Sequence, residues 1–384
     1  MLCLCTAIIA YVYAIYPALL CLLTAGRKYR AAEEYAYEDL PGVSMVTAAY
    51  NEESVIEAKV RNCLSLDYPA EKIEFFFVSD STDQTNEILT RLQSRQVIVR
   101  ILPERRGKLA ALNTVFPECR REVLVLSDAN AMYRPDAIRK LVRHFRNPEV
   151  GAATGDVRLM PSQKKFGQGE GLYYRYERRL QEMETDLWST VGIDGAMYAL
   201  RRSLLVASNN PLVADDFVTG MNVGRQGYRI VYDPEAIAEE DSTPSDEMEF
   251  RRKIRVVAYA FQSLMEGEGL PRWFQFRFLW VYVSHKLLRW LAPFFLAGAF
   301  AAAAVVSFGG PLGQAALGAQ AAFYALAFLG WKLPQTDSRF VRIPYYFVMV
   351  NLAAGLGVVR GVRRKQPRVW VRTDRSVPPA DASR

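Results

Sequence analysis

Histidine and cysteine are scarce in this sequence of 384 residues, which contains two of the former and five of the latter. The two histidines, His144 and His285, are too few for a histidine-rich metal site and speak against a Ser-His-Asp triad. No pair of cysteines has the C-x-x-C spacing, so neither a zinc site nor a disulfide framework is indicated. A reduced, cytoplasmic setting fits the middle of the chain.

Charge is missing from the first 26 residues, and the first basic residues are Arg27, Lys28 and Arg30. An apolar run of this length can cross a membrane, since a spanning helix needs about 20 residues. A cleaved signal peptide is the alternative, but such a peptide begins with basic residues and has a shorter apolar core. We therefore expect residues 1–26 to form a transmembrane helix and the chain that follows to lie in the cytoplasm.

Two further uncharged runs lie near the other end of the sequence. Residues 290–331 contain the breaker Gly309-Gly310-Pro311 and therefore predict a hairpin of two spans. Residues 343–359 form a shorter run, which a span, a re-entrant helix or an interfacial helix would each satisfy. Three full crossings would place the basic residues after 359 outside, against the positive-inside tendency, so the path of this run stays open.

Basic residues outnumber acidic ones, giving a net charge of +7, and they cluster beside the apolar runs. This placement favours a surface of anionic lipid over a groove for nucleic acid. We divide the chain accordingly into an N-terminal transmembrane helix (1–26), a catalytic domain (38–246), amphipathic interfacial helices (247–285), a C-terminal membrane region of two to three helices (286–361) and a basic, disordered tail (362–384).

The middle of the chain alternates between strand-like and helix-like patterns. We expect strands at 43–49, 73–79, 97–102 and 123–127, and helices at 52–66, 83–95 and 108–116. This alternation predicts an α/β domain with a mostly parallel sheet covered by helices on both faces. Ligands of such sheets bind outside the carboxyl ends of the strands, which is where the polar clusters of this sequence fall.

Polar clusters follow the first two strands. Ala49 and Tyr50 lead into Asn51 and Glu52, where small residues let the backbone approach a ligand and Asn51 would otherwise serve only as a helix N-cap. After the second strand, Asp80 offers a carboxylate that can accept hydrogen bonds from a base or ribose. The alternative for the second cluster is again an N-cap.

A basic cluster precedes the third helix, and Lys108 stands at its first position. Positive charge is unfavourable at a helix start, because the helix dipole is positive there. A phosphate would relieve that cost and use the free backbone N–H groups. A solvated basic loop is the alternative interpretation.

Asp128-Ala129-Asn130 ends the fully apolar strand at 123–127. Two oxygen-bearing side chains two residues apart point to the same side of an extended chain. Hard divalent cations prefer oxygen ligands and often complete their shell with phosphate oxygens. The pattern therefore predicts an Mg²⁺ or Mn²⁺ site at Asp128 and Asn130 that would neutralise a departing diphosphate, with a simple turn as the alternative.

Two charged segments come later in the sequence. Asp215 and Asp216 stand at a helix start, where they could serve the dipole alone, or where their proximity could raise one pKa and leave a general base. Residues 247–255 are rich in charge, and Arg252 and Arg255 share a helix face. That segment fits either an amphipathic helix on the membrane or an arginine clamp for a leaving diphosphate.

Taken in order, these clusters resemble the family-2 inverting glycosyltransferases, which carry a GT-A catalytic domain with a Rossmann-like mixed sheet. Membrane-bound members of that family include synthases of cellulose, hyaluronan, chitin oligosaccharide and poly-N-acetylglucosamine. The resemblance implies that Ala49, Tyr50, Asn51, Glu52 and Asp80 hold the base and ribose of a nucleotide-sugar.

The same resemblance implies roles for the later clusters. Lys108 would contact the nucleotide-sugar, and Asp128 with Asn130 looks like the metal-binding Asp-x-Asp motif. Asp194, in Gly192-Ile193-Asp194-Gly195-Ala196, would lie near the sugar or the acceptor. Asp216 looks like the general base of the family's Glu-Asp pair, and Arg255 looks like the arginine of its Gln-x-x-Arg-Trp motif.

Three motifs depart from the family pattern. Ser81 follows Asp80 where the family has glycine, and Asn130 replaces a carboxylate of the metal motif. The Gln-x-x-Arg-Trp segment reads Arg252-Lys253-Ile254-Arg255-Val256, so its glutamine and tryptophan are both replaced. Those two residues are associated with chain-extending synthases, which leaves processive synthesis open.

The function that this resemblance implies is transfer of a hexosyl or N-acetylhexosaminyl group, with inversion, from a nucleotide-diphosphate sugar such as a UDP-sugar. The acceptor would be a growing glycan or a lipid-linked molecule such as polyprenyl phosphate, and a partner or second copy would assist polymer export. The expected setting is a bacterial inner membrane. A non-catalytic membrane adaptor that retains the fold is the alternative.

Overall fold

The computed structural model describes residues 1–160, 167–208, 210, 215–241, 245–334, 336 and 338–364, and only the backbone of 167–170 and of Asp215. Within this part of the chain, eight strands form one sheet in the order β3-β2-β1-β4-β7-β6-β8-β5. The strands are β1 (Val43–Ala49), β2 (Ile73–Ser79), β3 (Val97–Ile101), β4 (Val123–Asp128), β5 (Met132–Tyr133), β6 (Val150–Met160), β7 (Met197–Arg201) and β8 (Arg229–Asp241).

The first four strands run parallel, as the alternating pattern predicts. Strand β7 is antiparallel to both β4 and β6, and the short β5 is antiparallel to β8, so the sheet is mixed. Because β1, β2 and β4 point the same way, their carboxyl ends meet at one edge. The polar residues that follow these strands are therefore neighbours in space.

Helices cover both faces of the sheet, so its central strands are apolar on both sides. Met45 and Val46 are adjacent in β1 yet belong to two different cores. Helices α3 (Ile56–Leu64), α4 (Thr85–Leu92) and α6 (Ala137–Val142) pack on the first core, while α5 (Lys108–Val115) and α8 (Asp215–Arg225) pack on the second.

The start of α3 differs from the sequence prediction. Asn51 is not the N-cap of α3, which begins at Ile56. The backbone of Asn51 adopts a left-handed conformation with φ 56°, which asparagine tolerates better than most residues. Its side-chain oxygen accepts a hydrogen bond from the backbone N–H of Thr82 (2.9 Å), so Asn51 joins the loops after β1 and β2.

In the part of the chain that the structure describes, four helical segments are long and apolar enough to cross a membrane: Leu2–Leu23, Phe276–Gly309, Pro311–Lys332 and Arg339–Val362. They comprise α1 (Leu2–Ala10), α2 (Tyr16–Leu23), α10 (Phe276–Tyr282), α11 (Leu288–Val306), α12 (Pro311–Lys332) and α13 (Arg339–Val362). The break at 307–310 produces the predicted hairpin of α11 and α12, and the run at 343–359 lies within α13, a helix of 24 residues.

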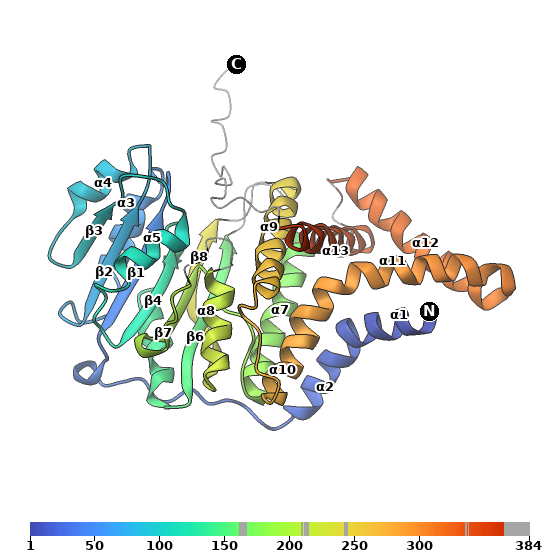
Figure 1. The fold of residues 1–384 in the computed structure, drawn as a ribbon, viewed down its shortest axis with the longest axis horizontal. Helices are drawn as coiled ribbons and strands as arrows, with labels where there is room; N and C mark the ends of the chain where they lie inside the picture. The colour runs from blue at the N-terminus through green and yellow to red at the C-terminus, as the bar shows by residue number, and fades with distance from the viewer. Residues whose placement is uncertain are drawn as a thin grey trace, which may run out of the picture.

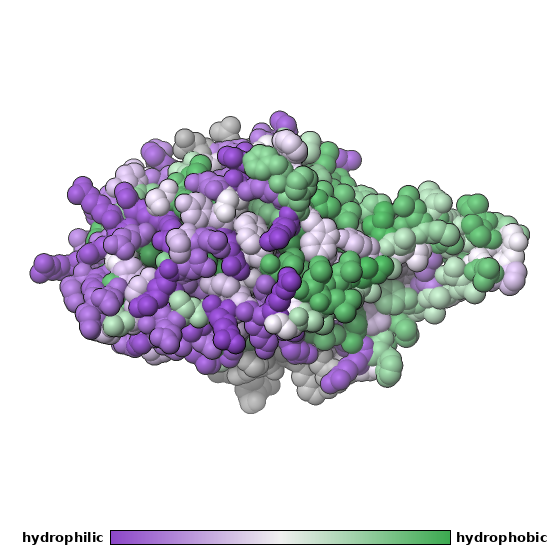
Figure 2. All heavy atoms as spheres, turned by 90° about the horizontal axis from the view of Figure 1, so that it is seen from below, coloured by the Kyte–Doolittle hydropathy of each residue, from purple (hydrophilic) through white to green (hydrophobic). Residues whose placement is uncertain are grey.

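Two helices connect the sheet with the membrane segments. Helices α7 (Gly167–Leu187) and α9 (Asp246–Met265) stand between β6 and β8 on one side and α11 and α13 on the other, while α1, α11 and α12 project away (Figure 1). Seen from below, hydrophobic side chains gather on the projecting part and hydrophilic ones on the sheet domain (Figure 2). This segregation fits a protein with one half in a bilayer.

Candidate active site

A cavity of about 890 Å³ opens at the carboxyl ends of β1, β2 and β4 and continues between α7, α9, α11 and α13. A space of this size holds a ligand as large as a nucleotide-sugar. Its walls include most of the residues singled out in the sequence, namely Ala49, Tyr50, Glu52, Asp80, Lys108, Asp128, Asn130, Asp194, Asp216, Arg252 and Arg255. Asp128 and Asp216 therefore open onto one shared cleft.

Two of the predicted site residues are placed differently. Asn51 holds the neighbouring loop rather than lining the cleft. Asp215 begins α8, but its side chain lies outside the described residues.

The loop before α5 closes one end of the cleft over Asp80. The Asp80 carboxylate accepts hydrogen bonds from the backbone N–H groups of Arg106 (2.9 Å) and Gly107 (3.1 Å). Gly107 has φ 84°, a left-handed conformation that favours glycine. The guanidinium of Arg105 lies 3.7 Å from the centre of the Tyr50 ring. These contacts hold the loop of residues 105–107 close to Tyr50 and Asp80 at this end of the cleft.

Lys108 links the start of α5 to the end of β4. Its ammonium nitrogen lies 2.8 Å from Oδ1 of Asp128, and both side chains are partly open to the cleft. The cation thus sits where the free N–H groups of α5 also point. An anionic group bound here would contact both positive features.

Asn130 and Glu240 meet on the opposite side of Asp128. The amide nitrogen of Asn130 donates to Oε1 of Glu240 (2.7 Å), and both residues line the cleft. Glu240 comes from β8 and was not singled out in the sequence, because nothing local marks it: the two residues are 110 positions apart. Glu240, from another strand, thus places a carboxylate beside Asn130.

This donor set fits a hard divalent cation. Asp128, Asn130 and Glu240 offer carboxylate and amide oxygens, and Mg²⁺ or Mn²⁺ prefers oxygen ligands. Among the residues that the structure describes, no three His, Cys, Asp or Glu side chains gather into a closed metal cluster. A cation at this place would therefore complete its shell with phosphate oxygens of a bound donor.

Lys59 supports the loop that carries Asp128 and Asn130. This fully buried side chain donates hydrogen bonds to Oγ of Ser127 (2.7 Å) and to the backbone oxygen of Ala131. Burial lowers the pKa of the Lys59 ammonium. A sequence signal for this residue exists, because Lys59 interrupts the apolar face of α3 formed by Ile56, Val60 and Cys63.

Asp216 stands at the start of α8, directly beneath the loop of Gly192–Ala196. A Cβ atom added at Gly195 would lie 2.7 Å from Oδ2 of Asp216, so only glycine lets the loop approach this carboxylate. Asp194, in the same loop, is open to the cleft yet enclosed by its walls, and this enclosure raises the pKa of its carboxyl. The loop and the start of α8 thus present two acids to one point of the cleft.

The arginines of α9 divide between two faces. Arg252 pairs with both oxygens of Glu249 (2.7 and 2.9 Å) and donates to the Tyr174 hydroxyl (2.7 Å). Arg255 also lines the cleft. Arg251 points outward, where its exposed guanidinium pairs with Glu247. Of these three arginines, Arg252 and Arg255 line the cleft, and Arg251 fits the alternative of surface charge.

The family model described as "Glycosyltransferase like family 2" matches residues 41–258. The chain belongs to this family. The match covers the sheet, the cleft at its edge and the first half of α9.

Curated relatives of this glycosyltransferase family are bacterial. Poly-beta-1,6-N-acetyl-D-glucosamine synthase of Staphylococcus aureus (strain COL) is 27% identical over 207 residues, or 52% of this chain and 50% of that protein. The protein named "Probable glycosyltransferase YdaM" of Bacillus subtilis (strain 168) is 27% identical over 232 residues, or 57% of this chain and 55% of that protein. The chain thus spans about half the length of the curated relatives it matches.

A solved structure extends the likeness to the membrane helices. A mannosyltransferase of Pyrobaculum calidifontis, solved with GDP-Man and Mn²⁺, superposes with a TM-score of 0.73 at 24% identity, covering 95% of this chain and 100% of that one. At this identity the match establishes the fold, a GT-A glycosyltransferase domain with the attached helices.

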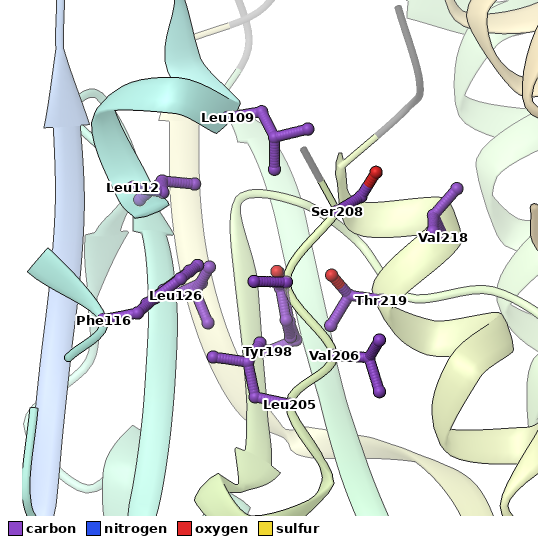
Figure 3. Close-up of a pocket in the computed structure, with 11 residues that line it drawn as sticks. Leu109, Leu112, Phe116, Leu126, Tyr198, Leu205, Val206, Ser208, Val218 and Thr219 are labelled. Carbon is purple, nitrogen blue, oxygen red and sulfur yellow. The ribbon is translucent and has the colours of Figure 1, made fainter. Parts of the chain in front are cut away.

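A second, small pocket of this glycosyltransferase lies between α5, β4, β7 and α8, away from the cleft (Figure 3). Leu112, Leu126, Tyr198 and Leu205 are among the side chains that surround it. Among the residues that the structure describes, no ionised group lines this pocket. It is a packing gap in the second core and has no chemistry for a phosphorylated substrate.

Proposed function

We propose that this glycosyltransferase transfers a hexosyl or N-acetylhexosaminyl group, with inversion, from a nucleotide-diphosphate sugar to an acceptor at the membrane. One observation carries the proposal: a single cleft holds Lys108 and Asp128 at the sheet edge and Asp216 at the start of α8. The first two suit a donor diphosphate, and the third suits an acceptor hydroxyl.

The donor would occupy the end of the cleft nearest β1 and β2. Tyr50 and Asp80 would hold the base and ribose, and Lys108 would pair with the diphosphate. A divalent cation held by Asp128 and Asn130, with Glu240 beside them, would supply positive charge to the departing diphosphate. Arg252 and Arg255 would add hydrogen-bond donors from α9.

The reaction would be one in-line displacement. Asp216 accepts the proton of the acceptor hydroxyl, whose oxygen then forms a bond to the anomeric carbon of the donor sugar. The bond from that carbon to the diphosphate oxygen breaks, and the electron pair leaves with the nucleoside diphosphate. The configuration at the anomeric carbon is thereby inverted, and Asp194 would orient the sugar or the acceptor.

The test separates transfer from donor binding. The full chain is screened with nucleotide-sugars in the presence of Mg²⁺ or Mn²⁺, and release of nucleoside diphosphate and formation of product are both scored. Replacing Asp216 with Asn should lower transfer at least about a hundredfold, the usual contribution of a general base. Donor affinity should stay near that of the wild type.

A matched control is Glu247→Gln, which removes an exposed carboxylate on the outer face of α9. It should leave both measurements unchanged. Equal loss of donor binding and transfer in Asp216→Asn would contradict the assignment of the base.

The length of the product distinguishes two acceptors. A ladder of products from the purified chain would mean a polysaccharide, whose export would need a partner or a second copy beside these four helices. One addition would mean a single sugar placed on a lipid-linked acceptor. For both, we place the catalytic domain on the cytoplasmic side of a bacterial inner membrane, because Arg27, Lys28 and Arg30 follow the first apolar segment.

A further inference from the structure

The far end of the cleft lies among membrane helices. Beyond the Gly192–Ala196 loop its walls come from the first span (Tyr13), from α11 (Trp290) and from α13 (Phe347, Val350 and Ala354). These side chains are aromatic or aliphatic, and α13 packs against α9 on the side of the projecting helices (Figure 1). The end of the cleft opposite the proposed nucleotide site therefore has the lining of a lipid site.

Charged side chains from α7 and from the start of α11 meet at the same place. Glu177 pairs with Arg289 and lies 3.1 Å from Nε2 of His285, whose Nδ1 is 2.6 Å from Glu184. Burial alone would raise the pKa of Glu177, but the charges of Arg289 and His285 lower it well below its usual range. Arg289 thus forms an ion pair with Glu177, and the His285 ring bridges Glu177 and Glu184.

Lys286 is a further basic residue beside this cluster. It lines the cleft and makes neither a hydrogen bond nor an ion pair with any residue that the structure describes. Its ammonium nitrogen faces the Gly192–Ala196 loop, since a Cβ atom added at Gly192 would lie 3.1 Å from it. A partly enclosed cation without a partner is costly, and an anion bound in the cleft would offset that cost.

We propose that Lys286 binds the phosphate or diphosphate of a lipid-linked sugar acceptor, whose sugar supplies the hydroxyl to Asp216 and whose hydrocarbon chain lies along Phe347, Val350 and Ala354. This inference rests on the proposed function and adds the chemical class of the acceptor. An amphipathic molecule matches both halves of the site, because its anionic group meets the unpaired ammonium and its tail meets the apolar wall. A neutral glycan would leave Lys286 unpaired and the apolar wall in contact with water.

The test measures lipid binding by the detergent-purified full chain. Radiolabelled polyprenyl phosphate should bind at least about tenfold more tightly than polyprenol of the same length, because only the former carries charge for Lys286. Inorganic phosphate should compete weakly, since it lacks the tail. Equal binding of polyprenol would overturn the proposal, and competition by inorganic phosphate as strong as that by the lipid would show a site for free anions instead.

Three variants identify the residue responsible. Lys286→Met should lose the preference for phosphate over alcohol, whereas Lys286→Arg should keep it. Lys332→Met, at the exposed end of α12, is the matched control and should bind like the wild type. If Lys286→Met still preferred polyprenyl phosphate over polyprenol, the assignment of Lys286 as the anion-binding residue would be wrong.

Donor binding, measured in the same preparations, separates this inference from the proposed function. A wild-type chain that binds polyprenyl phosphate but no nucleotide-sugar would refute the proposed function alone. A chain that binds donor but does not distinguish polyprenyl phosphate from polyprenol would refute the acceptor class alone. If Lys286→Met lost affinity for the donor as well as for polyprenyl phosphate, Lys286 would bind the donor or support the fold. That result would also overturn the inference.

Discussion

At the scale of single residues, the contact between Asn130 and Glu240 sets the charge beside Asp128. The amide donates to Glu240 at 2.7 Å, so these two side chains stabilise each other without a cation. Aspartate at position 130 could not donate, and two carboxylates would then face each other at this distance. A divalent cation would relieve that repulsion and would gain a second acidic ligand.

We therefore expect Asn130→Asp to lose about 2 kcal/mol of stability in a chelator, the typical cost of removing a hydrogen bond to a charged group. Its melting temperature should then rise more steeply with Mn²⁺ than that of the wild type, because binding to the folded state alone stabilises it. Thermal unfolding with EDTA and with a series of Mn²⁺ concentrations measures both effects. Asn130→Ala removes the amide without adding charge, so a matching Mn²⁺ response in that variant would contradict the explanation.

Residues at strand ends were predictable, and those brought in by distant strands were not. Asp80 and Asp128 were found because each directly follows an apolar strand, and parallel strands end at one edge. Glu240 lies in a long strand whose pairing with β6 depends on contacts about 80 positions apart in the sequence, for example Leu159 with Glu240. Lys286 was not predicted for a related reason: a single lysine beside an apolar run is typical of charge at a membrane interface.

At the scale of elements, α7 is the least predictable part of the fold and joins its two halves. Its pattern of charges and tyrosines does not predict a buried helix. The structure shows why it is one: Glu184 is fully buried and accepts hydrogen bonds from Tyr16 in the first span and from Thr190. A sequence can indicate the polar stripe of such a helix, but two partners of Glu184, Tyr16 and His285, lie more than 100 positions away.

Glu177 is the residue of α7 on which this junction can be tested. Replacing Glu177 with Gln leaves Arg289 and His285 without their shared carboxylate. We expect a loss of about 3 kcal/mol, the low end for breaking a buried ion pair, because 19% of the Glu177 side chain reaches solvent. Glu182→Gln, which breaks a surface pair with Arg179 on the same helix, should cost at most about 1 kcal/mol.

The pH dependence of this loss follows from the lowered pKa of Glu177. Between the folded pKa and the unfolded value of about 4.3, the unfolded state binds more protons, so stability rises with pH in that window. The contribution of Glu177 is thus complete above about pH 4.3 and disappears as the pH falls through the folded pKa. Melting curves should show a constant gap between wild type and Glu177→Gln near neutral pH, and a narrowing gap in acid. A gap independent of pH would show that packing, rather than charge, is lost.

At the scale of the whole molecule, the cleft is one space with walls from two environments. The mixed sheet and its α/β class were predictable because local patterns set the strands and helices. The position of α13 was not, because its hydropathy fits a lipid-facing span. In the structure 44% of its most apolar stretch is buried, against 11–22% for the other candidate spans, since α13 packs on α9 and forms a wall of the cleft.

Glycine makes this packing possible, and it offers a test of whether the two halves work together. A Cβ atom at Gly357 would lie 2.7 Å from Cβ of Val257 and 2.9 Å from the backbone oxygen of Ile254, so Gly357→Leu must push α13 away from α9. Overpacking of this kind costs about 1–3 kcal/mol, and it would displace the wall formed by Val350 and Ala354. Sugar transfer should fall about tenfold or more, equivalent to about 1.4 kcal/mol of transition-state stabilisation. Donor affinity should hold, because the proposed nucleotide site is built by the sheet.

The control for this variant is Gly318→Leu in α12, where an added Cβ would meet nothing within 4 Å. It introduces the same side chain into a membrane helix that does not line the cleft, so both transfer and donor binding should match the wild type. Initial rates and donor dissociation constants of the two leucine variants, measured in the same detergent, decide the matter. If Gly357→Leu lost donor affinity in step with transfer, α13 would act by stabilising the whole domain. If it lost neither, the membrane half would be an anchor that takes no part in the reaction.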